Sequence, residues 1–173
     1  MAIGALCTAA CAAIVDVRSG RIPNWLTGGG LLAALVLQFY FMGWRGLGTG
    51  VSGALVGGGI LFVPFLVRGI GAGDVKLMAA VGAWVGIQHA VAAIFATAIA
   101  GGVLAVAYVV FHDQSATTFR RVADLMQFHI RAGLRPHPGF GKEEPASIRF
   151  PYSLAIVSGA LYVFVSTARF IRG

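Results

Sequence analysis

The sequence is poor in charge. Only 11% of its 173 residues are charged, and 58% are hydrophobic. A soluble domain of this size does not need so much apolar surface, so the composition predicts a chain that lies in the lipid bilayer. The apolar runs are continuous and do not alternate with polar residues, which argues against a membrane barrel. The expected fold class is therefore all-α, a polytopic membrane helical bundle.

Cysteine is also scarce. The two cysteines, Cys7 and Cys11, lie four residues apart in the first apolar run. No CxxC motif and no histidine cluster accompanies them, so the sequence offers no metal site, and we expect no cofactor. We expect both cysteines to be small packing residues on one helix face. No Lys or Arg precedes this first run, which argues against a cleaved signal peptide.

Six apolar segments can be marked in the chain. Their approximate ranges are 1–16, 26–43, 47–67, 75–88, 90–111 and 150–168. One crossing of the hydrocarbon core needs about 20 residues. A single helix over 75–111 would be about 55 Å long, which is too long for one crossing, so we predict a tight turn at 86–89. No internal repeat is visible, which gives no support to an inverted-repeat transporter.

Basic residues decide the orientation of this six-span arrangement. With the N-terminus outside, the 13 Lys and Arg residues divide into ten on the inner side and three on the outer side. The outer three are Arg45, Arg169 and Arg172. The positive-inside rule therefore predicts six spans in the cell inner membrane, with both termini on the non-cytoplasmic side. The same rule accounts for the net charge of +7, so we expect no nucleic-acid partner.

The longest polar stretch, residues 112–149, then lies on the cytoplasmic side. Most of its apolar residues between 119 and 130 fall on one helical face. This pattern predicts a short amphipathic helix that rests in the membrane interface. We interpret the whole chain, 1–173, as a single membrane-embedded domain that includes this loop.

Two of the six acidic residues stand apart from the others. Asp16 and Asp74 lie at the ends of apolar runs, whereas the other four lie in the polar stretch 112–149. Acidic residues at membrane segments are costly and usually functional. The predicted topology places both at the cytoplasmic face, so we expect one shared site. Two close carboxylates can share a proton and activate water, and the sequence leaves open which of them is the base.

Each aspartate also has a purely structural interpretation. Asp16 would end a helix and pair with a neighbouring arginine, and Asp74 would cap a helix N-terminus. The two glycines before Asp74, Gly71 and Gly73, favour the functional interpretation. They permit backbone conformations that other residues resist, and they leave room for an extended substrate.

Three stretches of the sequence resemble one known family. They are Ile22-Pro23-Asn24-Trp25-Leu26-Thr27 after Asp16, Gly71-Ala72-Gly73-Asp74-Val75-Lys76-Leu77, and Phe150-Pro151-Tyr152-Ser153-Leu154-Ala155. They resemble the type IV prepilin peptidases, which are membrane aspartic proteases of the GxGD type. The resemblance implies that Asp16 and Asp74 are catalytic. We expect the residues around them to shape the site or bind substrate: Gly71, Gly73, Lys76, Ile22, Pro23 and Asn24.

The resemblance also implies a substrate and a subtype. It implies cleavage of the basic leader of a prepilin or pseudopilin at the cytoplasmic face, while the apolar helix of the substrate stays in the membrane. Longer members carry an N-terminal domain with CxxC motifs and methylate the new N-terminus. This chain lacks those cysteines, so it resembles the short Tad/Cpa form that serves Flp pili, without methyltransferase activity. Pilus-assembly machinery is then a further expected partner.

Three alternatives remain open at this point. An archaeal-type preflagellin peptidase would share the same motifs. A small proton- or cation-coupled transporter would use the two aspartates as ligands, but it would place them near the middle of the bilayer. A non-catalytic assembly subunit would use them only to anchor helices, and it would tolerate Asp→Asn at both positions.

Overall fold

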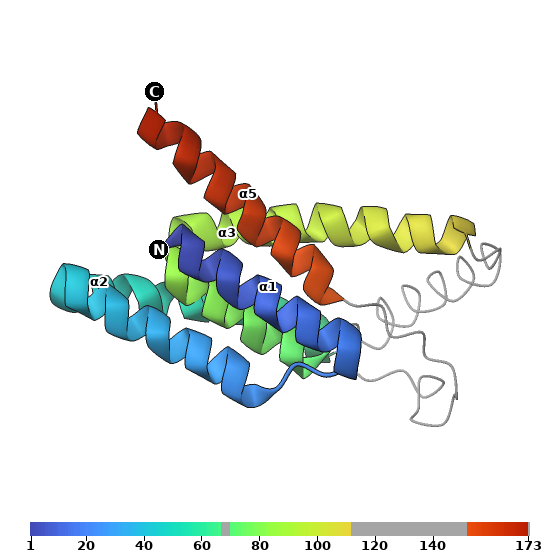
Figure 1. Cartoon of the computed structure of the whole chain (residues 1–173), viewed down its shortest axis with the longest axis horizontal. Coiled ribbons are helices and arrows are strands. Elements are labelled where there is room, and N and C mark those ends of the chain that lie inside the picture. The colour runs from blue at the N-terminus through green and yellow to red at the C-terminus, as the bar shows by residue number, and fades with distance from the viewer. Residues whose placement is uncertain (67–69, 112–151, 173) are drawn as a thin grey trace.

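A computed structural model describes residues 1–66, 70–111 and 152–172 of the chain (Figure 1). These residues form helices and no strands. The helices are α1 (Ala2–Ser19), α2 (Asn24–Leu66), α3 (Ala72–Phe111) and α5 (Tyr152–Arg172). All four are long and apolar enough to cross a membrane. The prediction of an all-helical membrane protein is confirmed.

Two of the helices are interrupted at a glycine. Gly43 in α2 has φ 61 and ψ −144, and Gly86 in α3 has φ 77 and ψ 173. Positive φ favours glycine, which has no Cβ to clash with the backbone. Figure 1 shows that both helices double back, so each consists of two arms that run in opposite directions. The break in α3 falls within the turn that the sequence predicts at 86–89.

Glycines let the second arm of α2 lie directly against the first arm of α3. A methyl group on Gly53 would meet the carbonyl oxygen of Gly82, and one on Gly57 would meet that of Met78. Helices in lipid associate through such close packing, because burial from water contributes little there. Gly53 and Gly57, which lie four residues apart, are therefore helix-packing positions.

The side chain of Gln38 donates hydrogen bonds to the backbone just before the break in α3. This side chain is buried in the first arm of α2, and its Nε2 donates to the carbonyl oxygens of Ala83, at 3.1 Å, and Trp84, at 3.4 Å. Carbonyl groups in the last turn before a helix break lack their helical amide partners. Gln38 therefore satisfies backbone acceptors that would otherwise be left unpaired in an apolar interior.

The face of α1 that packs against the other helices consists of alanine. Ala5, Ala9 and Ala12 are fully buried, whereas Cys7 and Cys11 are exposed free thiols. The prediction that the cysteines pack between helices is therefore wrong. Cysteine and alanine are both small enough for close helix contact, so size alone does not indicate which of them faces the other helices.

Four predictions concern residues or properties beyond this description. The amphipathic helix within 112–149 and the pair Phe150-Pro151 lie outside the described residues. The single-domain organisation of the chain also stays a prediction, as does the side of the membrane on which its termini lie.

Candidate active site

Asp16 and Asp74 come from different helices and meet at one end of the bundle. Asp16 lies in the last turn of α1, which ends at Gly20, and Asp74 lies in the first turn of α3. Figure 1 shows the end of α1 beside the start of α5 at this end. The Asp16 carboxylate lies close enough to Asp74 to act on it electrostatically. The structure thus brings together the two acids that the sequence singles out.

Asp16 is held by a serine from α5. The hydroxyl Oγ of Ser153 donates to Asp16 Oδ2 at 2.6 Å. Ser153 is fully buried and lies in the first turn of its helix, whereas Asp16 is half-buried. The structural interpretation that paired Asp16 with a neighbouring arginine is therefore not what the structure shows.

Asp74 forms hydrogen bonds with Gly71, the residue just before its helix. Its Oδ2 accepts the Gly71 N–H at 3.3 Å, and its own amide donates to the Gly71 carbonyl oxygen at 3.1 Å. Asp74 is thus a first-turn residue of α3 and not the cap residue itself. Among the described residues, Asp74 Oδ1 is buried and has no hydrogen-bond partner. Burying a polar oxygen without a hydrogen-bond partner costs free energy of folding. Asp74 Oδ1 is therefore available to bind a ligand.

The loop between α1 and α2 packs against the start of α3. A methyl group on Gly73 would lie 3.1 Å from Cβ of Ile22, so this glycine lets the loop approach the helix closely. Lys76 Nζ donates to Asn24 Oδ1 at 2.9 Å. The carbonyl oxygen of Pro23 accepts the first backbone hydrogen bonds of α2. The residues that the sequence predicts around the two acids therefore do lie at this end of the bundle.

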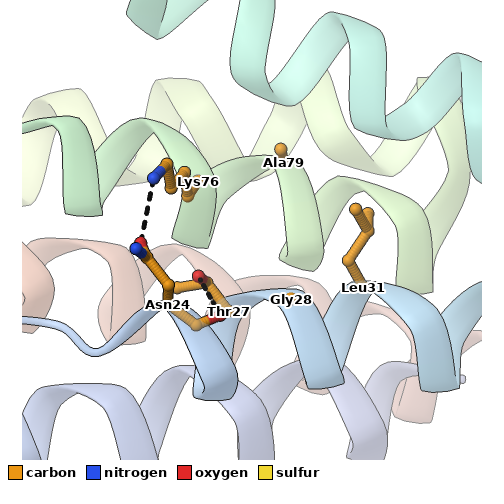
Figure 2. A pocket seen from close by; sticks show the side chains of 6 residues that line it. All are labelled: Asn24, Thr27, Gly28, Leu31, Lys76 and Ala79. Carbon is orange, nitrogen blue, oxygen red and sulfur yellow. Dashed lines mark hydrogen bonds between the residues drawn. The ribbon is translucent and has the colours of Figure 1, made fainter.

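A groove of about 300 Å³ runs beside Lys76 (Figure 2). It lies between the first arms of α2 and α3, and its lining residues are Asn24, Thr27, Gly28, Leu31, Lys76 and Ala79. Asn24 and Lys76 point toward one another at one end of it. The opposite end, at Leu31 and Ala79, is apolar. Such an arrangement suits a ligand with an apolar body and a polar end.

The contact between Ser153 and Asp16 could not be found by sequence analysis. Ser153 lies within a stretch that resembles the family, but no motif or spacing connects it with an acid 137 positions away. Helix periodicity predicts which residues share a face of one helix. It does not predict the register between two helices that are distant in sequence.

In the described part of the chain, the apolar helices and the two carboxylates are those of a multi-pass membrane protein with an acidic site at the helix ends. A family model described as "Type IV leader peptidase family" matches residues 3–106, which is more than half of the chain and includes Asp16 and Asp74. The chain belongs to the type IV leader peptidase family, and the resemblance found in the sequence is confirmed. This family indicates a peptidase with prepilin-type substrates. No curated protein and no solved structure matches the chain.

Proposed function

We propose that the chain is an aspartic endopeptidase that removes the leader peptide of Flp-type prepilins at the cytoplasmic face of the membrane. The observation that carries this proposal is the meeting of Asp16 and Asp74 at one end of the bundle, within electrostatic reach of one another. Two carboxylates from separate helices have no structural need to meet. Their mutual repulsion is a cost that a shared chemical task explains.

The proposed mechanism needs only these two side chains and water. The pair holds one proton between its two carboxyl groups. The ionised carboxylate takes a proton from a water molecule, whose oxygen attacks the scissile carbonyl carbon. The protonated carboxyl group supports the developing charge on the carbonyl oxygen, and a proton then passes to the leaving amine. The unpartnered Asp74 Oδ1 is a suitable atom to meet the substrate carbonyl.

The groove beside Lys76 suits the apolar part of such a substrate. Its lining is mostly apolar, and it begins next to the loop that packs on the acidic site. The basic leader would be attracted by the two carboxylates. We therefore propose that the apolar helix of the prepilin lies along the groove while its leader crosses Asp16 and Asp74.

The proposed orientation has six crossings with both termini on the non-cytoplasmic side. It is supported by the division of basic residues into ten inside and three outside, together 13, and by the breaks at Gly43 and Gly86. A test uses Ser19, which is exposed next to the site. In a chain with Cys7 and Cys11 replaced by serine, Ser19→Cys should react with an impermeant maleimide only after the inner membrane is opened. Labelling of intact cells would contradict this orientation.

The position of the acids disfavours the transporter alternative. A proton- or cation-coupled transporter would hold its carboxylates near the middle of the bilayer. Asp16 and Asp74 instead occupy the last turn of one helix and the first turn of another. A site at helix ends suits a substrate that is cut where it leaves the membrane.

The proposal is tested by processing of a prepilin in cells. The chain is co-expressed with each of several Flp-type prepilins, and the N-terminus of the product is read by mass spectrometry. We expect loss of the basic leader and one defined new N-terminus. Unprocessed prepilin across the whole panel, with the chain present in the membrane, would contradict the proposed function.

A further inference from the structure

The mechanism above leaves one buried polar group of the site without a task. This group is the hydroxyl of Ser153, on a helix that contributes neither of the two acids. α5 packs against both α1 and α3, so its first turn lies where those helices bring the acids together. Ser153 directs its hydroxyl at Asp16 and is itself fully buried.

This contact supplies Asp16 with a hydrogen-bond donor, which suits an ionised carboxylate because such a group can only accept hydrogen bonds. The distance between Ser153 Oγ and Asp16 Oδ2 is 2.6 Å. A donor held in a packed helix also fixes the rotation of the carboxylate plane. The bond occupies one oxygen of Asp16, and the described residues provide no hydrogen bond to its other oxygen.

Asp74 has the opposite surroundings. Its Oδ2 accepts one long hydrogen bond of 3.3 Å, and its Oδ1 is buried without a partner among the described residues. Buried charge without hydrogen bonds is strongly disfavoured. Of the two carboxyl groups, that of Asp74 therefore holds the shared proton at the lower free energy.

We infer that Ser153 is a positioning residue that orients Asp16 and makes it the proton acceptor of the pair, with Asp74 as the proton donor. This inference rests on the proposed peptidase function. As the water oxygen bonds to the carbonyl carbon, one water proton passes to Asp16 and the Asp74 proton passes to the carbonyl oxygen. When the C–N bond breaks, Asp16 gives its proton to the leaving amine and Asp74 regains one from the collapsing diol.

The test compares three variants with the wild type as purified chains acting on one Flp-type prepilin. Ser153→Ala removes the donor with little change in volume, and kcat should fall roughly tenfold to a hundredfold, the effect of losing a hydrogen bond to a charged group. KM should stay unchanged, because Ser153 does not lie in the groove. Ser153→Thr keeps the hydroxyl and should recover most of this loss.

Ser158→Ala is the matched control. Ser158 is an exposed serine on the same helix, and among the described residues its hydroxyl bonds to the carbonyl oxygen of Leu154, at 3.1 Å. This variant should cleave at the wild-type rate. The thermal unfolding temperature of every variant is measured in parallel, so that a loss of folded protein is separated from a loss of kcat.

The outcomes separate this inference from the proposed function. A wild-type kcat in Ser153→Ala would overturn the inference alone, and so would an equal loss in a stably folded Ser153→Thr. A fall in rate that is fully explained by less folded protein would also overturn it, since the serine would then only hold helices together. A wild-type chain that cleaves no prepilin would overturn the proposed function, and the inference with it.

Discussion

The close contact of α2 with α3 allows a sharp prediction at Gly53. In Gly53→Ala, the new methyl group would meet the carbonyl oxygen of Gly82 and the Cα of Gly86. Both are backbone atoms, which cannot rotate away as a side chain can. The two arms must therefore separate, and the first arm of α3 carries Asp74.

The expected loss of stability in Gly53→Ala follows from a comparison with Gly59→Ala in the same arm. A methyl group on Gly59 would meet nothing within 4 Å. Both variants gain the helix propensity of alanine, about 1 kcal/mol, so this gain cancels in the comparison. What remains is the cost of overpacking, about 1–3 kcal/mol. For a chain of this size, that difference lowers Tm by roughly 2–12 °C.

The assay is thermal unfolding in detergent, followed by helical circular dichroism, together with the rate of prepilin cleavage. Gly53→Ala should unfold at a lower temperature than Gly59→Ala and should cleave more slowly. Gly59→Ala should match or slightly exceed the wild type in stability. Equal unfolding temperatures for the two variants would refute the close backbone contact on which this reasoning depends.

Two further predictions concern Gln38 and Lys76. Gln38→Ala should lower Tm by roughly 2–12 °C, because it leaves buried carbonyl groups unpaired at a cost of about 1–3 kcal/mol. Gln88 is exposed, so Gln88→Ala should change Tm little. An equal fall in Tm for the two variants would contradict the role of Gln38 in satisfying these carbonyl groups. Lys76→Met should raise KM roughly two- to tenfold with little change in kcat, because it removes the 2.9 Å bond to Asn24 at the end of the groove. An unchanged KM in cleavage kinetics would remove Lys76 from substrate binding.

Much of the candidate site is predictable from the sequence because its signals are local. Acidic residues are rare here, so their position at the ends of apolar runs is informative. The distribution of basic residues alone predicts that Asp16 and Asp74 share one side of the membrane. The turn at 86–89 follows from the length of the apolar stretch, and α3 is indeed broken at Gly86.

The remaining features depend on register between helices, which periodicity does not encode. Gln38 lies in an apolar run, and nothing in the sequence shows that it faces the carbonyl groups next to a break in another helix. Cys7 and Cys11 illustrate the same limit, because the alanines beside them are equally suited to close packing. In lipid, burial from water does not select one face of a helix over another, so apolarity is a weak guide to the packed face.

The most direct test of the two-acid site is the rate of prepilin cleavage by Asp16→Asn, Asp74→Asn and the double variant, at matched levels of folded chain in the membrane. Removing a general acid or base should reduce kcat at least about a hundredfold. The two groups act as a unit, so the double variant should be no slower than the slower single one. Cleavage near the wild-type rate by either single variant would contradict the account.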